Sequence, residues 1–242
     1  MKDVILVKGT SGAGKSSRVF VFLKYLRDNL GLKHEIIEIS NKEGKMKPIG
    51  FHFPELNDLV ILGKTFYSGS IERFQGYDNI TSTFGTSAGF SKWLKLNKDR
   101  YSVLIEGAGV TKTHRLRPIF LFREVGFQNI FMQYYNFKPE QKPEYLARIV
   151  GRSGKEPGEQ MWEKNLGFIR EVEESRVEKE ELLRDSDFKG TINILVDPYD
   201  HDVDDLGLKL ILVFYPNLDE DEFISFSRTE NYIEQNKFEN FQ

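Results

Sequence analysis

The chain contains no cysteine, so disulfides, thiolate metal sites and cysteine nucleophiles are all excluded. No apolar run approaches the ~18 residues that a membrane-spanning helix needs, and the N-terminus lacks the apolar core of a signal peptide. The four histidines (His34, His52, His114 and His201) are scattered, which argues against a histidine-based hydrolase. From these absences we expect a cytoplasmic protein whose chemistry depends on other side chains.

A glycine-rich turn near the N-terminus is the strongest motif that is present. The apolar run Val4–Val7 leads into Gly9-x-x-x-x-Gly14-Lys15-Ser16, which fits the Walker A spacing without a mismatch. Successive backbone N–H groups of such a turn point at phosphate oxygens, the lysine reaches the β- and γ-phosphates, and the serine hydroxyl holds Mg²⁺. We therefore predict an ATP site formed by Gly9, Thr10, Ser11, Gly12, Ala13, Gly14, Lys15, Ser16 and Ser17.

The order of the elements predicts an α/β fold with a doubly wound, mainly parallel sheet, as in P-loop NTPases. Apolar runs predict strands, and apolar residues at spacings of three and four predict helices. The strands are expected at 4–8, 34–40, 102–106, 129–135 and 191–196, and the helices at 15–30, 114–125, 139–150 and 157–184. Residues 50–66 predict a β-hairpin insertion, because two short apolar runs flank Asn57-Asp58. We expect a kinase domain over 1–215, with an insertion at 42–98 and a helical lid at 139–165, followed by a tail at 216–242.

Glu106 is a candidate for metal binding or for general base catalysis. It ends the buried run Ser102–Glu106, and ligands of open α/β sheets bind at the carboxyl ends of the strands. A carboxylate there can hold Mg²⁺ or accept the proton of an attacking hydroxyl. Glu38, near the end of the second predicted strand, is a rival base, although a solvated edge position is as good an interpretation of it.

Two arginines suggest a mobile clamp for phosphates. Arg148 and Arg152 are four residues apart, so they share one face of the predicted helix, and a Pro157-Gly158 break follows. Guanidinium groups stabilise the negative charge that develops on a transferring phosphoryl group. The alternative is an ordinary basic surface helix.

The stretch 63–94 is the candidate acceptor site, because it mixes aromatic residues with Gly, Ser and Thr. Such a mixture can stack a base and read its edge. The candidate residues are Phe66, Tyr67, Arg73, Phe74, Gln75 and Asp78, of which Asp78 is also a third candidate base. The alternative is a loop whose aromatic residues only anchor it to the core.

Charge is distributed unevenly along the chain. Residues 111–155 hold nine Lys or Arg against three acids, whereas the tail from 216 holds seven acids against two bases. A local basic zone suits phosphate binding without the general basicity of a non-specific DNA coat. Arg115 and Arg117 are therefore candidates for contacts with the acceptor's phosphates, with exposed helix charges as the alternative. The aromatic residues of the tail fit either a packed helix or a loose segment.

Together, the GTSGAGKSS turn, the strand ending at Glu106-Gly107 and the Arg148…Arg152 segment resemble the P-loop kinases that include polynucleotide kinases. The resemblance implies that Arg148 and Arg152 belong to a lid that closes over ATP. It covers residues 1–41 and 100–165, and it departs at Ser40-Asn41, where polynucleotide kinases carry an aspartate as base. With the aromatic insertion, the pattern is most similar to the bacteriophage kinases that phosphorylate 5-hydroxymethyluracil in DNA.

The expected activity is therefore ATP- and Mg²⁺-dependent transfer to a hydroxyl of a nucleic-acid acceptor, in the host cytoplasm if the protein is phage-encoded. Two alternatives remain open at the level of sequence. One is a nucleoside or nucleotide kinase that acts on a free small molecule. The other is an ATP-binding regulatory module without transfer, against which the arginine pair and the aromatic stretch argue.

Overall fold

A computed structural model of the 242-residue chain describes most of the sequence. The described residues are 2–10, 12–40, 43–63, 71, 81–107, 118–153, 159–198, 219, 221–227 and 229. Within this part of the chain, no helix is both long and apolar enough to cross a bilayer.

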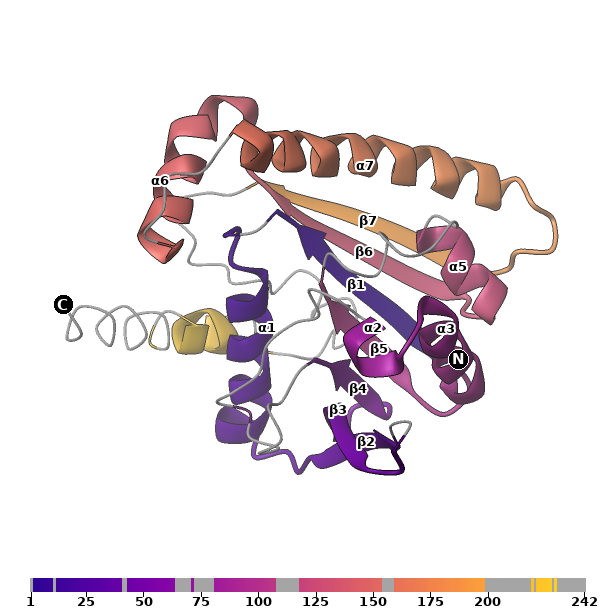
Figure 1. The fold of residues 1–242 in the computed structure, drawn as a ribbon. Coiled ribbons are helices and arrows are strands. Elements are labelled where there is room, and N and C mark those ends of the chain that lie inside the picture. The colour runs from indigo at the N-terminus through magenta and orange to yellow at the C-terminus, as the bar shows by residue number, and fades with distance from the viewer. Residues whose placement is uncertain are drawn as a thin grey trace.

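The described strands form one seven-stranded sheet in the order β2-β3-β4-β5-β1-β6-β7 (Figure 1). The strands are β1 (Asp3–Gly9), β2 (Glu35–Ser40), β3 (Met46–Phe53), β4 (Leu59–Leu62), β5 (Ser102–Glu106), β6 (Asn129–Asn136) and β7 (Thr191–Pro198). Pairing is parallel from β4 to β7 and antiparallel at β2–β3 and β3–β4. The mainly parallel α/β sheet expected from the sequence is confirmed.

The strand that leads into the glycine-rich turn lies in the middle of this sheet. β1 pairs with β5 on one side and β6 on the other, and its residues from Val4 onward are buried. A strand covered on both faces is a continuous apolar run rather than an alternating one, which explains the Val4–Val7 sequence. The turn therefore starts from a buried strand that is paired on both sides.

Helices cover both faces of the sheet. The helices and helical turns are α1 (Lys15–Lys24), η1 (Tyr25–Asn29), α2 (Thr81–Phe84), α3 (Ser87–Asn97), α5 (Pro118–Val125), η3 (Pro139–Gln141), α6 (Lys142–Ser153) and α7 (Glu159–Leu183). One apolar core joins the sheet to α1, α6 and the start of α7. The other joins the opposite face to α3, α5 and the rest of α7, which runs alongside β6 and β7 in Figure 1.

One detail of the predicted fold is wrong. The 34–40 run predicts a strand of the parallel core, but among the described strands β2 lies at the edge and pairs only with β3, and its residues are exposed or half-buried. The β-hairpin predicted at 50–66 forms between β3 and β4, and it belongs to the main sheet because β4 also pairs with β5. The chain thus uses an antiparallel hairpin to extend a parallel sheet.

The helix after the glycine-rich turn and part of the acidic tail lie together. α1 continues into a π-helical turn, η1, which begins at Tyr25. Residues 221–227 form a helix beside α1 (Figure 1), where Phe223 is fully buried against the Tyr25 ring at 4.8 Å between centroids. Residues 221–227 therefore agree with the interpretation of the tail as a packed helix.

Candidate active site

Gly9 makes the glycine-rich turn possible. It has φ 136°, and a Cβ atom at this position would lie 1.9 Å from the carbonyl oxygen of Tyr135 on β6. That carbonyl accepts a hydrogen bond from the next backbone N–H, Thr10, at 3.2 Å. A side chain here would therefore push the turn away from the strand that supports it.

Lys15 begins α1 at the point where the turn ends. Gly14 is the N-cap residue in a left-handed conformation, so the N-terminal end of the helix faces the turn. The Lys15 side chain is buried, and its Nζ donates to the Thr10 carbonyl oxygen at 2.7 Å. An ammonium group, backbone N–H groups and a helix N-terminus thus meet in one place, which is an arrangement that binds phosphate.

Ser16 and Glu106 come together across two adjacent strands. Glu106 is 3% exposed at the end of β5, in register with Val7 of β1, and the Ser16 hydroxyl donates to its Oε2 at 3.0 Å. The expected proximity of Glu106 to the glycine-rich turn is confirmed. Hard oxygen donors of this kind suit Mg²⁺, which takes one or two protein ligands and completes its shell with water and phosphate. The described residues contain no group of three or more His, Cys, Asp or Glu side chains that could hold a metal ion.

Arg18 supports the turn from within the core, and the sequence did not single it out. Its guanidinium stacks on the Tyr135 ring at 4.2 Å and donates to the Ala13 carbonyl oxygen at 2.5 Å, while the residue is only 5% exposed. The guanidinium group is therefore not a solvated charge but a brace between β6 and the turn. The available signal was its position three residues after Lys15, which places both side chains on one face of the helix.

Helix α6 packs against the turn through apolar and hydroxyl groups. The Ile149 side chain lies close to Gly12, where an added Cβ would be 3.3 Å from its Cδ1 atom. The Thr10 hydroxyl is 3.5 Å from the Tyr145 hydroxyl, which donates to the Met161 carbonyl oxygen of α7 at 3.0 Å. Tyr145 is thus the point at which the turn, α6 and α7 meet.

The two predicted lid arginines belong to this helix. Arg148 is exposed, one residue before Ile149, and Arg152 is part of α6 although its side chain lies outside the described residues. The structure therefore places the segment beside the phosphate site, and the catalytic role of the arginines stays a prediction.

A buried lysine connects the other face of β1 to α7. Lys8 is fully buried and forms an ion pair with Glu171, while Tyr134 shares a 2.7 Å hydrogen bond with Ser175 one helical turn further on. Burial lowers the pKa of Lys8, and the nearby Glu171 carboxylate opposes that shift. The strand that carries the turn is thus fastened to α7 by charge as well as by packing.

Most of the predicted acceptor site lies outside the described residues. This applies to Phe66, Tyr67, Arg73, Phe74, Gln75 and Asp78, as well as to Arg115, Arg117 and Ser11 of the other predicted sites. The end of the 63–94 stretch is described and forms α2 and most of α3. There Phe90 is fully buried, and Phe84 lies 5.1 Å from its ring centroid, so these two aromatic residues anchor the stretch to the core.

Glu38 lies far from the phosphate site. It is an exposed residue of the edge strand β2, and three strands separate β2 from β1. At about 4.8 Å per strand, the side chain is well beyond contact with the glycine-rich turn. The interpretation of Glu38 as a general base is therefore wrong, and the solvated edge position is the correct one.

Comparison with known proteins identifies the family. A family model described as 5-hmdU DNA kinase 2 matches residues 1–197, which is most of the chain. The chain belongs to this family. A curated 5-hmdU DNA kinase 2 from Salmonella phage ViI is 31% identical over 186 residues. The aligned region covers 74% of this chain but only 58% of the relative's length. The resemblance to phage kinases of 5-hydroxymethyluracil in DNA is thereby confirmed.

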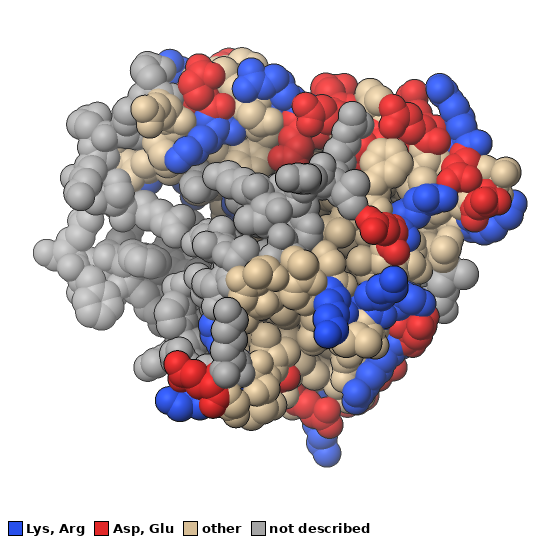
Figure 2. Space-filling model, turned by 45° about the vertical axis from the view of Figure 1, so that its right-hand side comes forward, with Lys and Arg blue, Asp and Glu red and all other residues tan. Residues whose placement is uncertain are grey.

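On the face that Figure 2 shows, the positive and negative side chains of the described residues do not form separate patches. In the view of Figure 2, the blue Lys and Arg side chains are interspersed with the red Asp and Glu side chains. A protein that coats DNA without selection would instead show a broad basic face. On this face, the described residues offer local basic contacts only.

Proposed function

We propose that this family member is an ATP-dependent phosphotransferase that phosphorylates the hydroxymethyl group of 5-hydroxymethyluracil in DNA. The observation that carries the proposal is the contact between Ser16 and Glu106 beside Lys15, at the N-terminus of α1. It combines a phosphate cradle with the oxygen ligands that Mg²⁺ prefers. The relative's name supplies the acceptor, since it is a kinase of 5-hmdU in DNA.

The transfer forms a bond between the acceptor hydroxyl oxygen and the γ-phosphorus of ATP. The bond from that phosphorus to the β–γ bridging oxygen breaks, ADP leaves with the electron pair, and the hydroxyl proton passes to a base. Lys15 exchanges the Thr10 carbonyl for the β- and γ-phosphates, and the backbone N–H groups of the turn hold the remaining oxygens. Mg²⁺, held through Ser16 and Glu106, would supply positive charge against the phosphates.

The remaining roles fall to residues on either side of this cradle. Arg148, exposed on α6, is assigned to the transferring phosphoryl group, which its guanidinium would contact on closure of the helix over ATP. Because Glu106 already accepts from Ser16, we assign it to the metal and leave Asp78 as the candidate base. The second candidate function is that of a P-loop kinase of free nucleosides, and the phosphate cradle is the observation that supports it.

The test is transfer of labelled phosphate from ATP to four acceptors. These are duplex DNA with 5-hydroxymethyluracil, the same duplex with thymine, single-stranded DNA with the modified base, and the free modified nucleoside. We expect the modified DNA to be labelled and the thymine duplex and free nucleoside to remain unlabelled. Labelling of the free nucleoside alone would refute the DNA acceptor, and labelling of none would refute the kinase.

Lys15→Ala tests the cradle itself. It should abolish transfer, because the β- and γ-phosphates lose their nearest cation. Lys24→Ala, at the other end of the same helix, is the matched control and should leave transfer unchanged.

A further inference from the structure

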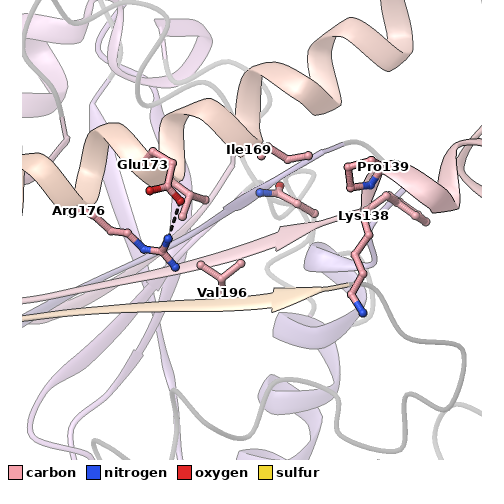
Figure 3. A pocket seen from close by; sticks show the side chains of 9 residues that line it. Lys138, Pro139, Ile169, Glu173, Arg176 and Val196 are labelled. Carbon is pink, nitrogen blue, oxygen red and sulfur yellow. Dashed lines mark hydrogen bonds and ion pairs between the residues drawn. The ribbon is translucent and has the colours of Figure 1, made fainter.

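A cavity of about 190 Å³ lies between the ends of β6 and β7 and the middle of α7 (Figure 3). Its walls are mainly apolar and include Phe137, Ile169, Val172 and Val196. Lys138 and Arg176 lie at opposite ends of it, with Val196 between them. The cavity is large enough for one flat ring system and too small for a long ligand.

Asn136 gives the cavity its polar character. It lines the cavity, is only 5% exposed, and neither its amide nitrogen nor its amide oxygen has a hydrogen-bond partner among the described residues. Gln133 on the same strand is also buried without amide partners, but only Asn136 of the two lines the cavity, where a ligand can complete its hydrogen bonds.

A second buried asparagine nearby shows that the fold can satisfy a carboxamide. Asn165 of α7 is fully buried, and its amide bonds both the N–H and the carbonyl oxygen of Phe137, at 3.2 and 3.1 Å. The Phe137 backbone thus completes the hydrogen bonds of the Asn165 amide, whereas the Asn136 amide stays open to the cavity. The difference marks Asn136 as a group for recognition rather than for packing.

The chemistry of the cavity fits a nucleotide. A carboxamide donates and accepts side by side, which matches the adjacent donor and acceptor on the edge of a nucleobase. The apolar walls suit the faces of the ring. Among the described residues, the one ion-pair partner of Arg176 is the exposed Glu173, at 2.5 Å, so a phosphate at this end of the cavity could engage its guanidinium. The exposed Lys138 marks the opposite end.

The cavity is separate from the phosphate cradle. Tyr135 supports the glycine-rich turn on the α1 face, and Asn136, as the next residue of the same strand, points to the α7 face. The two sites therefore share the carboxyl edge of the sheet but lie on opposite faces of it.

We propose that this cavity is a second nucleotide site, which binds the base edge through Asn136 and a phosphate through Arg176. The nucleotide comes either from solution or from the DNA strand, and only the DNA source rests on the proposed function. A DNA nucleotide held here would fix the strand at a distance from the reacting base.

Binding of two kinds of probe tests the proposal and separates the sources. Titration calorimetry with dTMP and dAMP reports a free nucleotide, and fluorescence anisotropy of a labelled thymidine dodecamer reports a DNA strand. Asn136→Leu should lower the affinity for whichever probe binds at least about tenfold. The melting temperature of this variant should equal or exceed that of the wild type. Arg176→Gln should reduce the salt dependence of binding by about one phosphate contact. Arg184→Gln, directly after the C-terminal end of α7 and with its own exposed partner Glu180, is the matched control.

The pattern of probe binding across the three variants decides whether the second site exists. Binding that survives Lys15→Ala and is lost in Asn136→Leu or Arg176→Gln supports a second site, with the dodecamer alone indicating a DNA source. Binding of no probe, or binding that both cavity variants keep, overturns it. Because Arg176 is exposed, its variant keeps the test decisive even if Asn136→Leu fails to fold. The phosphate-transfer assay is independent, so failure here does not refute the kinase.

Discussion

Glu106→Gln distinguishes a metal-binding role from a catalytic base. The substitution keeps the size of a side chain that is 3% exposed, and the carboxamide oxygen can still accept from Ser16. The fold should therefore persist. What is lost is the negative charge, which strengthens a hydrogen bond by roughly 1 kcal/mol and attracts the cation.

The expected result is a change in the magnesium dependence of the enzyme. If Glu106 acts through the metal, the Mg²⁺ concentration for half-maximal rate should rise about 10–100-fold, and saturating Mg²⁺ should restore most of kcat. A general base would instead lower kcat by ~10²–10⁴-fold at every Mg²⁺ concentration. The assay is labelled-phosphate transfer to DNA with 5-hydroxymethyluracil across a magnesium titration.

Glu35→Gln on the edge strand β2 is the control, because it removes a carboxylate far from the turn. It should match the wild type at all magnesium concentrations. A kcat loss in Glu106→Gln that magnesium cannot restore would refute the metal assignment. A Glu106→Gln variant with wild-type kinetics would remove the residue from the site altogether.

Three further perturbations test other parts of the site. Gly9→Ala should prevent nucleotide binding and lower the melting temperature, because its Cβ would lie 1.9 Å from the Tyr135 carbonyl oxygen; calorimetric binding at wild-type affinity would contradict the geometry. Arg148→Ala should lower kcat far more than it raises the Kd for ATP, since the contact strengthens in the transition state; unchanged kcat with weaker ATP binding would make it a ground-state contact. Because burial lowers the pKa of Lys8 below its unfolded value, the folded state binds fewer protons, and stability should rise with pH between the lowered pKa and about 10.5. Lys8→Met should lose that rise in urea titrations at a series of pH values, and an identical pH profile would show that Lys8 does not titrate on unfolding.

Local patterns predicted the central strands well. The runs around Val4, Ser102, Ile130 and Ile192 are strands within one or two residues of the expected bounds, since a buried parallel strand is a continuous apolar run. The pairing of β4 with β5 could not be predicted from the sequence, because two short apolar strands do not specify which distant strand they join. The exposed position of β2 follows from that pairing.

In the site, the motif predicted the turn but not its supports. Ser16 and Glu106 meet as expected, because the turn that leads to Ser16 follows β1, and Glu106 ends the adjacent parallel strand β5. The sequence alone does not distinguish Arg18 from an ordinary charged residue on a helix, because its burial depends on Tyr135, more than a hundred residues away in the chain. In α6 the sequence pattern pointed to the two arginines, whereas the residues that pack against the glycine-rich turn are Ile149 and Tyr145. The acceptor residues around Asp78 remain predictions.

The helix at residues 221–227 changes where the folding unit ends. The family match stops at residue 197, yet Phe223 is fully buried against Tyr25 at the end of the helix that starts at Lys15. The part of the sequence shared with relatives is therefore smaller than the part that packs as one body. A chain cut after residue 197 would keep the whole region that the family model matches and still expose the Tyr25 ring, at the far end of the helix that starts at the phosphate site.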